Sequence, residues 1–428
     1  MNETEKIYNI FRKHPVVSID SRNVPSGSVF FGIKGPRFNG NDFAAEAINK
    51  GAVCAVVDET AGVKNDKFFR VDNTLETLQS LARIHRQKLQ VKILAITGTN
   101  GKTTTKELCN AILNRKYNVL ATKGNLNNHI GVPLTLLLLR QENEIGIIEM
   151  GANHPGEIAA LCKIAMPDYG LITNIGKAHL EGFVNIEGVR KAKGELFEYL
   201  MQYQKTIYLN EKDPLVSSII SQGYENCVPY NGKTCYGELI SNDPFLKARI
   251  KTTKYDFVLK TNLTGKYNLE NVIAAVAVGT DFGVSPDMIA EAAEDYIPDN
   301  YRSQFIETAR NRIIMDAYNA NPSSMKQAIE NFLELKGENK LLIIGQMLEL
   351  GNESTAEHKK ITDYLQERQL KQVFLIGSAF RVCGNLPYVI YDTTDEFINN
   401  YDPSKISSNL ILIKGSRANR LEKLLPFL

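Results

Sequence analysis

The sequence lacks an excess of charge of either sign. Its 428 residues include 50 Lys and Arg against 48 Asp and Glu, which leaves a net charge of +2. No block of like charge forms a tail, so neither a nucleic-acid partner nor a charged interaction tail is expected. The apolar fraction of 43% and the charged fraction of 23% are ordinary for soluble globular chains.

Paired cysteines and long apolar runs are also missing. No two cysteines form a CxxC pair, which predicts buried free thiols in a reducing compartment. The longest apolar run, 134–139, is far shorter than the about 20 residues that a membrane span needs. Residues 1–17 lack the apolar core of a signal peptide. We therefore expect a monomeric cytoplasmic enzyme without membrane insertion. The cysteines are Cys54, Cys109, Cys162, Cys227, Cys235 and Cys383.

The length suggests about three domains at roughly 150 residues each. Apolar runs that read as strands alternate with helical patterns along the whole chain, which predicts an α/β fold with parallel sheets covered on both faces. One more polar stretch, 224–262, predicts an antiparallel extension. The expected strands are 28–33, 53–59, 68–72, 91–97, 144–150, 169–175, 205–210, 312–318, 340–346, 372–377, 388–392 and 410–416.

The rhythm of these elements divides the chain into three predicted domains. A smaller N-terminal α/β domain, 1–88, ends in a long helical pattern at 74–89. A central P-loop domain with a parallel sheet follows at 89–298, and it includes a helical pattern at 268–283. The C-terminal domain, 299–428, is expected to be a Rossmann-like unit without the glycine fingerprint of that fold.

The strongest motif is a phosphate loop at 97–104, TGTNGKTT, between an apolar strand and a helix. A glycine-rich turn lets backbone N–H groups face phosphate oxygens, and the helix N-terminus adds partial positive charge. In such a loop the lysine reaches the terminal phosphates and the next hydroxyl holds Mg²⁺. Ile96 stands where the general pattern has its first glycine, so the loop is the shorter GxxGKT form. The residues expected at the nucleotide are Gly98, Thr99, Asn100, Gly101, Lys102, Thr103 and Thr104.

A P-loop also needs an acidic residue near the metal. Glu149 ends the next strongly apolar strand, and the carboxyl ends of parallel strands face the ligand crevice. We therefore expect Glu149 to serve the metal, and the alternative is a solvated carboxylate at a strand end.

Seven segments resemble the Mur ligase family, and they run in family order over nearly the whole chain. The stretches EMGANHPGEI (149–158) and DAYNANPSSM (316–325) are similar to the branch of that family that adds D-alanyl-D-alanine. The other matching stretches are TGTNGKTTTKE (97–107), GNLNNHIGVPLTLL (124–137), TNIGKAHLEGF (173–183), KAKGELF (191–197) and KGSRANRLE (414–422). The segment 20–35 resembles the UDP-binding domain of the branch.

The resemblance implies ATP and Mg²⁺ as cofactors, with two magnesium ions in the site. Thr103 and Glu149 would hold one ion, and His179 would ligate the second, with Glu149 shared. Lys193 aligns with a lysine that becomes carbamylated in related ligases, a change that turns a cation into a carboxylate-like ligand. The alternative for Lys193 is an ordinary surface lysine in a Lys-rich helix.

The resemblance also implies contacts with nucleotide and substrate. Asn268 and Asn271 would lie at the adenine side, although Asn268 could instead cap a helix. Arg302 would reach the γ-phosphate when the domains close about a hinge near 297–303, and Asp316 would contact ribose. Residues expected at the substrates are Asp20, Ser21 and Arg22 for the UDP-sugar, Tyr318, Asn319 and Asn321 at the closed interface, and Lys414 and Arg417 for a carboxylate or phosphate.

The implied activity is ATP-dependent ligation through an acyl-phosphate. The expected substrates are D-alanyl-D-alanine and UDP-N-acetylmuramoyl-tripeptide, a precursor of peptidoglycan. Alternatives are a sister ligase that adds a single amino acid, a folate polyglutamate ligase, a P-loop kinase for a small alcohol, and a nucleotide-binding module without catalysis. The sequence leaves open whether lysine or diaminopimelate is the third residue of the acceptor.

Two positions depart from the pattern of the branch. Gln346 stands where the branch often has an aspartate, and Asn41 stands where it often has a histidine. Both departures bear on details of substrate contact and leave the expected reaction class unchanged.

Overall fold

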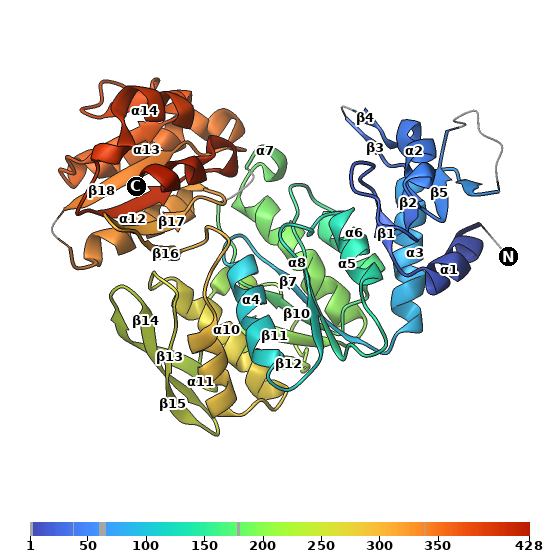
Figure 1. Ribbon diagram of the computed structural model, residues 1–428. Helices are drawn as coiled ribbons and strands as arrows, with labels where there is room; N and C mark the ends of the chain where they lie inside the picture. Colours follow the sequence, from blue (N-terminus) through green and yellow to red (C-terminus); the bar gives the residue numbers. More distant parts are fainter. Residues whose placement is uncertain (1–2, 37, 60–65, 178–179, 338) are drawn as a thin grey trace.

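Three α/β bodies follow one another along the chain in the computed structural model (Figure 1). The structure describes residues 3–36, 38–59, 66–177, 180–337 and 339–428. The N-terminal body, in blue, lies at the opposite end of the molecule from the C-terminal body, in orange and red, and the central body joins them.

The N-terminal body is built on a four-stranded parallel sheet in the order β1-β2-β5-β6. A small antiparallel pair, β3 and β4, lies beside it. The elements are α1 (Glu3–Lys13), β1 (Val17–Ser18), β2 (Val29–Phe31), β3 (Lys34–Gly35), β4 (Phe38–Asn39), η1 (Gly40–Phe43), α2 (Ala44–Asn49), β5 (Cys54–Val57), β6 (Phe68–Arg70) and α3 (Thr74–Lys88). The three strands predicted here are confirmed, and the long helical pattern at 74–89 forms α3.

The central body holds a six-stranded parallel sheet in the order β12-β11-β10-β7-β9-β8. An antiparallel sheet, β13-β14-β15, extends it. The prediction for 224–262 was wrong in one part, because residues 227–230 form a parallel edge strand paired with β11. The elements are β7 (Lys92–Thr97), α4 (Lys102–Leu113), β8 (Val119–Ala121), α5 (Gly131–Leu137), β9 (Ile145–Glu149), α6 (Glu157–Ala165), β10 (Tyr169–Ile172), α7 (Leu180–Phe183), α8 (Ile186–Gln202), β11 (Thr206–Asn210), α9 (Pro214–Ser217), β12 (Cys227–Tyr230), β13 (Cys235–Asn242), β14 (Leu246–Thr252), β15 (Asp256–Lys260), α10 (Asn268–Asp281) and α11 (Pro286–Asp295).

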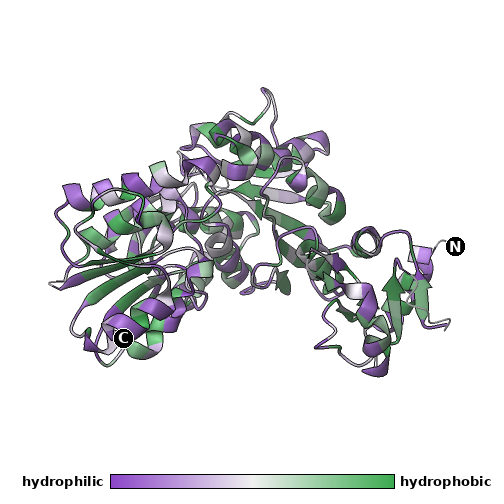
Figure 2. Ribbon diagram, turned by 90° about the horizontal axis from the view of Figure 1, so that it is seen from above, coloured by the Kyte–Doolittle hydropathy of each residue, from purple (hydrophilic) through white to green (hydrophobic). Residues whose placement is uncertain are grey.

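Both faces of the central sheet are covered by helices, which explains its unbroken apolar strands. Successive side chains of a strand point to opposite faces. In β7, Ile93 and Ala95 join the core that includes α5, α6 and α8, whereas Leu94 and Ile96 join the core that includes α4, α10 and α11. The hydropathy colours of Figure 2 show the same layering: the strands are mostly hydrophobic, and the helices that cover them carry both hydrophobic and hydrophilic residues. No helix in the described ranges is both long enough and apolar enough to cross a membrane.

The C-terminal body carries a six-stranded sheet in the order β16-β17-β21-β18-β19-β20, in which only β16 runs antiparallel to its neighbour. All five strands predicted here are confirmed, and β16 is an additional one. The elements are β16 (Gln304–Glu307), β17 (Arg312–Asp316), α12 (Pro322–Glu334), β18 (Lys340–Gly345), η2 (Gly351–Glu353), α13 (Ser354–Glu367), β19 (Val373–Ile376), η3 (Ser378–Phe380), β20 (Val389–Tyr391), α14 (Thr394–Tyr401), η4 (Pro403–Lys405), β21 (Leu410–Lys414), η5 (Arg417–Asn419) and η6 (Leu421–Phe427).

The end of α3 attaches the N-terminal body to the central one. His85 is buried and its Nε2 lies 2.9 Å from the carbonyl oxygen of Leu139. Arg86 donates to the carbonyl oxygen of Ala165 at 3.0 Å and to the Asp168 carboxylate at 2.8 Å. These buried polar contacts fix α3 against the central sheet.

The burial of His85 predicts a loss of stability in acid. Burial lowers the pKa of His85 below its ordinary value of 6.5, so the unfolded chain binds a proton at a pH where the folded chain does not. Stability is then fully present above pH 6.5 and falls as the pH drops below it. We expect the melting temperature to fall between about pH 7.5 and about pH 5.5, and to fall less in His85→Gln. The exposed His14→Gln is the matched control, and an unchanged slope in His85→Gln would contradict the assignment.

Candidate functional site

The loop between β7 and α4 has the shape of a phosphate cradle. Gly98 and Gly101 have φ angles of 141° and 78°, in the region that side chains rarely adopt. A Cβ atom on Gly98 would lie 2.0 Å from Oγ1 of Thr173, and one on Gly101 would lie 2.2 Å from Oδ1 of Asn271. Both positions therefore require glycine. The loop leaves the N-terminus of α4 open to an anion.

Lys102 bends back over this loop. Its Nζ donates to the carbonyl oxygens of Gly98 at 2.6 Å and Thr99 at 3.0 Å. Burial lowers the pKa of Lys102 to about 8, the nearby Glu149 carboxylate acts against that shift, and the Arg302 charge adds to it. A bound phosphate would stabilise the ammonium form, because an opposite charge within reach favours the charged state.

Glu149 is the buried acidic residue of the site. It is only 1% exposed, so the alternative of a solvated strand end is excluded. Its Oε1 accepts a hydrogen bond from Nδ2 of Asn127 at 2.8 Å, while its Oε2 is buried and has no hydrogen-bond partner among the residues that the structure describes. A carboxylate oxygen left in this way is costly unless a ligand meets it. Thr103, in the first turn of α4, is also buried.

These residues fit a magnesium ion. Mg²⁺ is usually held by one or two carboxylates together with substrate phosphates and water. Within the described ranges, no three His, Cys, Asp or Glu side chains form a metal-binding group. One buried carboxylate with a free oxygen beside a phosphate loop is the arrangement such an ion needs. His179, the predicted ligand of a second ion, lies outside the described residues.

Lys193 on α8 is not a surface lysine. It is 2% exposed, its Nζ donates to the carbonyl oxygen of Ala152 at 3.2 Å, and it lies 5.4 Å from the centre of the Phe183 ring. Burial, together with the nearby charge of Lys102, lowers the pKa of Lys193 to about 7. A large fraction of this amine is therefore neutral near neutral pH.

The two asparagines of α10 are tied into the protein. Nδ2 of Asn271 donates to Oδ1 of Asn268 at 2.8 Å, and Nδ2 of Asn268 donates to the carbonyl oxygen of Thr264 at 2.7 Å. Asn268 does not cap the helix, because the N-cap is Tyr267. Oδ1 of Asn271 accepts from Thr105 of α4 at 3.1 Å. This network fixes α10 against the helix of the phosphate loop.

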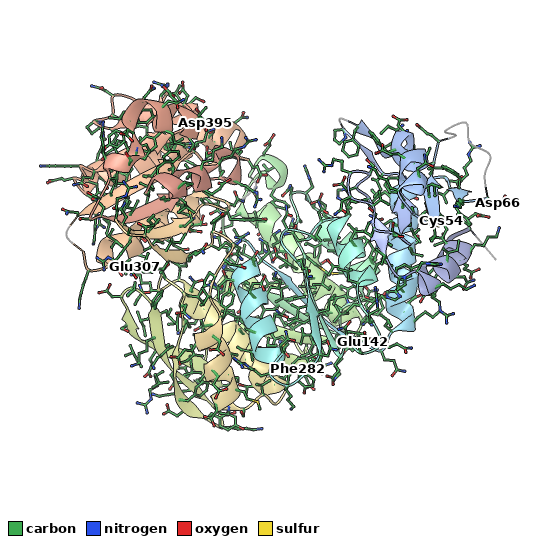
Figure 3. All side chains as sticks on the ribbon, in the orientation of Figure 1. Cys54, Asp66, Glu142, Phe282, Glu307 and Asp395 are labelled. Carbon is green, nitrogen blue, oxygen red and sulfur yellow. The ribbon has the colours of Figure 1, made fainter. Side chains whose placement is uncertain are left out.

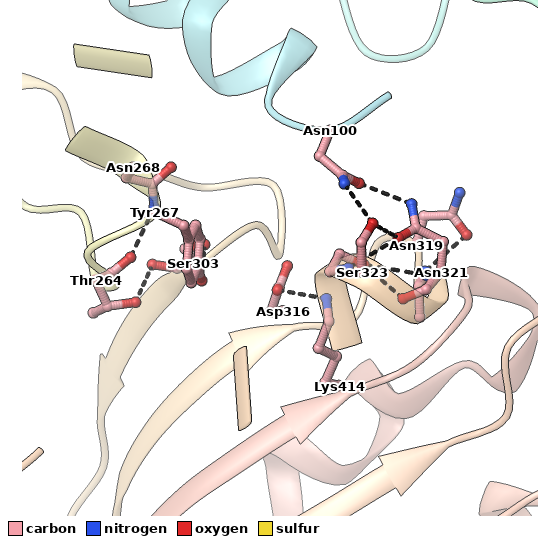
Figure 4. A network of polar contacts seen from close by, with 12 residues as sticks. Asn100, Thr264, Tyr267, Asn268, Ser303, Asp316, Asn319, Asn321, Ser323 and Lys414 are labelled. Atoms are coloured by element: carbon pink, nitrogen blue, oxygen red, sulfur yellow. Dashed lines mark hydrogen bonds and ion pairs between the residues drawn. The ribbon is translucent and has the colours of Figure 1, made fainter. Parts of the chain in front are cut away.

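The C-terminal body reaches the phosphate loop directly (Figure 4). Asn321 is the N-cap of α12, and its Nδ2 donates to Oδ1 of Asn100 at 2.8 Å. Nδ2 of Asn100 in turn donates to Oγ of Ser323 at 3.1 Å. The carboxyl ends of β17 and β21 meet at the same edge, where Nζ of Lys414 lies 2.6 Å from Oδ2 of Asp316.

Two arginines flank one aromatic ring at this edge. The guanidinium carbon of Arg302 lies 4.0 Å from the centre of the Tyr318 ring, and that of Arg417 lies 5.0 Å from it. Nε of Arg302 is buried and finds no hydrogen-bond partner within the described part of the chain. This donor can therefore serve an anion. Asn319 uses its Oδ1 to accept the backbone N–H of Ala320.

A cavity of 490 Å³ unites most of the predicted site residues. That volume lies within the usual range for small-ligand sites. The predicted residues that line it are Thr99, Asn100, Gly101, Lys102, Thr103, Thr104, Asn268, Asn271, Arg302, Asp316, Asn319, Asn321 and Lys414. Sequence reasoning missed Asn174, Lys212, Lys266, Tyr267, Glu270, Gln327 and Glu330, which also line it. The sequence could have indicated Asn174, because this polar residue comes just after the carboxyl end of an apolar strand, β10, in the way that Glu149 ends β9.

The predicted UDP-sugar residues lie elsewhere, in the N-terminal body. Arg22 pairs with the carboxylate of Asp20 at 2.8 Å, and the Arg22 side chain is 88% exposed. The hydrogen bonds from Arg22 lower the pKa of Asp20 to about 2. Asp20, Ser21 and Arg22 do not line the 490 Å³ cavity.

The two departures from the branch pattern have internal roles. Asn41 is 1% exposed, its Nδ2 donates to Oδ1 of Asp58 at 2.8 Å, and its Oδ1 accepts the backbone N–H of Asp58 at 3.0 Å. Oε1 of Gln346 accepts the backbone N–H of Ala379 at 3.2 Å. Both side chains therefore join loops of their own domains.

Three family models match successive segments of the chain, one in each of the three bodies. Residues 15–90 match the model of the Mur ligase family catalytic domain, 96–279 match the Mur ligase middle domain, and 301–417 match the Mur ligase glutamate ligase domain. The chain belongs to the Mur ligase family.

Individual relatives agree over nearly the full length. The UDP-N-acetylmuramoyl-tripeptide--D-alanyl-D-alanine ligase of Bacillus subtilis is 34% identical, with 95% of this chain and 92% of the relative covered. The enzyme of that name from Escherichia coli is 33% identical over 84% and 81%. A crystal structure of MurF from Acinetobacter baumannii has a TM-score of 0.86 at 31% identity, covering 96% and 92%. MurF ligase from Thermotoga maritima, solved in complex with ADP, has a TM-score of 0.84 at 28% identity, covering 96% of each chain.

Proposed function

We propose that this protein is an ATP-dependent ligase that joins D-alanyl-D-alanine to UDP-N-acetylmuramoyl-tripeptide. The observation that carries the proposal is the buried Glu149 carboxylate, whose free oxygen lies at the strand end beside a phosphate loop. The full-length similarity to ligases of that name supports the choice of substrates. The domain boundaries 1–88, 89–298 and 299–428 belong to the same proposal.

Residue roles follow from the cavity. Backbone N–H groups of 98–104 and the α4 N-terminus bind the phosphates. Lys102 exchanges its hydrogen bonds to the carbonyl oxygens of Gly98 and Thr99 for a contact with the terminal phosphate. Asn268 and Asn271 shape the adenine side of the cavity, and Asp316, held by Lys414, meets the ribose. Arg302 offers its free Nε–H to the transferring group. Asp20, Ser21 and Arg22 receive the UDP-sugar.

Thr103, Glu149 and a carbamylated Lys193, together with His179, would hold Mg²⁺. An ion held by these residues would neutralise charge that develops on the transferring phosphoryl group. The chemistry then proceeds in two steps. The substrate carboxylate oxygen attacks the γ-phosphorus and ADP leaves, which gives an acyl-phosphate. The amine of the dipeptide attacks the acyl carbon, and the tetrahedral intermediate expels phosphate as the amine loses a proton.

An assay of ADP release tests this function. We expect turnover only when UDP-N-acetylmuramoyl-tripeptide and D-alanyl-D-alanine are both present, and a new amide in the product. Release driven by a single amino acid would favour a sister ligase. A stable phosphoester without phosphate release would favour a kinase. Either result would overturn the proposal.

The pKa of Lys193 predicts that carbamylation depends on pH. Carbon dioxide reacts with a neutral amine, and with a pKa of about 7 this amine becomes neutral as the pH rises through 7. We expect ¹³C-bicarbonate to give a carbamate signal in the NMR spectrum on the alkaline side of that value. The signal should be absent in Lys193→Ala and retained in the control Lys191→Ala. A spectrum without the signal in the unmodified protein would contradict the assignment.

Domain closure is expected around 297–303. Tyr301 and Ser303 in this connection have φ angles of 56° and 49°, which marks a bend in the chain between the central and C-terminal bodies. The acyl-phosphate must be kept from water, so closure should accompany binding. We expect the radius of gyration from X-ray scattering to decrease when an ATP analogue and the UDP-substrate are both added. Identical curves with and without these ligands would count against the hinge.

A further inference from the structure

A fully buried lysine lies one turn beyond the phosphate loop and has no part in the mechanism above. Lys106 on α4 is 0% exposed. Its Nζ donates to Oε1 of Glu107 at 2.5 Å and to the carbonyl oxygen of Thr122 at 2.6 Å. Lysine is rarely buried completely, and it is buried only when paired. The contact with Thr122 connects Lys106 to Glu149, because Thr122 also bonds to the Glu149 backbone.

Thr122 connects this lysine to the metal-binding carboxylate. It follows the edge strand β8 and is 1% exposed. Its carbonyl oxygen accepts from Lys106, while its hydroxyl oxygen accepts the backbone N–H of Glu149 at 3.0 Å. Its own backbone N–H donates to the carbonyl oxygen of Ile147 at 2.9 Å. One residue therefore bridges α4 and the end of β9.

Glu149 is thus fixed from two sides. Asn127 holds its Oε1 at 2.8 Å, and the backbone N–H of Gly151 donates to the carbonyl oxygen of Asn127 at 2.7 Å. Thr122 holds its backbone. The oxygen that these contacts leave free is Oε2. Thr122 bonds to the backbone from which this carboxylate projects, and β8, with three half-buried residues, is a short strand at the edge of the sheet.

We propose that Lys106 is a positioning residue that acts through Thr122 to aim the Glu149 carboxylate at magnesium. The inference rests on the proposed function, since it assumes that Glu149 binds the ion. Residues that orient metal ligands from behind typically change metal affinity or activity by about 10- to 100-fold when they are lost. Lys106 and Thr122 act in series, so removing either one should have much the same effect as removing both.

Metal affinity is the readout that a general loss of structure would not reproduce. Lys106→Met keeps the length of the side chain and removes its donors, and Thr122→Val keeps the shape and removes the hydroxyl acceptor. Mn²⁺ binding to the ADP complex is followed by electron paramagnetic resonance, and metal-free ADP binding by calorimetry. Matched controls are Thr135→Val, at a threonine that is also 1% exposed but bonds within α5, and Lys359→Met on the surface.

We expect both variants to bind Mn²⁺ about 10- to 100-fold more weakly. Metal-free ADP affinity should be unchanged, and the double variant should resemble the single ones. Normal Mn²⁺ affinity in either variant, additive losses in the double variant, or a parallel loss of metal-free ADP binding would overturn the inference. If Lys106→Met does not fold, the Mn²⁺ affinity of Thr122→Val alone tests the inference. Failure of the unmodified protein to bind ADP would instead refute the proposed function.

Discussion

Replacing Lys102 with alanine is expected to lower the rate of ligation by on the order of 10²- to 10³-fold, the usual cost of removing one preorganised donor from a transition state. Lys102 carries the one lysine charge of the loop 98–104, and its Nζ donates to the backbone carbonyl oxygens of Gly98 and Thr99 in that loop. The measurement is kcat for ADP release with both substrates saturating.

The control for this change is Lys326→Ala, at a lysine of α12 whose side chain is 59% exposed. Its rate should match that of the unmodified protein. ADP should still bind to Lys102→Ala, because the backbone of 98–104 and the cavity walls remain. A rate in Lys102→Ala within a few-fold of normal would show that the terminal phosphate lies elsewhere.

Replacing Glu149 with glutamine is expected to have an effect of similar size. A metal ion contributes several kcal/mol to a transition state that carries developing charge. Each step of about 1.4 kcal/mol is a factor of ten in rate, so a loss of roughly 10³-fold is expected. Glutamine keeps an acceptor for Asn127 and removes the charge that Oε2 offers to the ion. The measurement is kcat across a series of Mg²⁺ concentrations.

The melting temperature distinguishes a loss of metal binding in Glu149→Gln from damage to its fold. A buried carboxylate oxygen without a partner is unfavourable, so the melting temperature of metal-free Glu149→Gln should not fall. Glu142→Gln, on an exposed loop before β9, is the control and should leave the rate unchanged (Figure 3). Full activity in Glu149→Gln would remove the basis for the metal site.

The sequence was most informative where a local pattern decides the structure. Buried parallel strands such as β7 and β9 are continuous apolar runs, so their positions and their carboxyl-end residues could be predicted. The strand–turn–helix at 97–104 predicted the glycine loop for the same reason. The strand β8 was missed, because Val119, Leu120 and Ala121 are only half-buried at a sheet edge and lie between polar residues.

Contacts that depend on packing between distant segments could not be predicted in this way. Asn100 and Asn321 are 221 residues apart, and their hydrogen bond exists only because the C-terminal body packs against the phosphate loop. The burial of Lys193 depends likewise on Phe183 and the carbonyl of Ala152, and the pattern of its own helix left a surface position open as the alternative. The wall of the cavity formed by Lys212, Lys266 and Glu270 combines the loop after β11 with the start of α10, which are more than 50 residues apart in the sequence.

The central claim is that the substrate carboxylate takes the γ-phosphoryl group before the amine attacks. An oxygen-isotope experiment tests it directly. UDP-N-acetylmuramoyl-tripeptide with ¹⁸O in both oxygens of its terminal carboxylate is turned over with ATP and D-alanyl-D-alanine, and the released phosphate is analysed by mass. The account predicts one ¹⁸O atom in each phosphate, because the attacking oxygen stays on phosphorus. Phosphate without the label would contradict it.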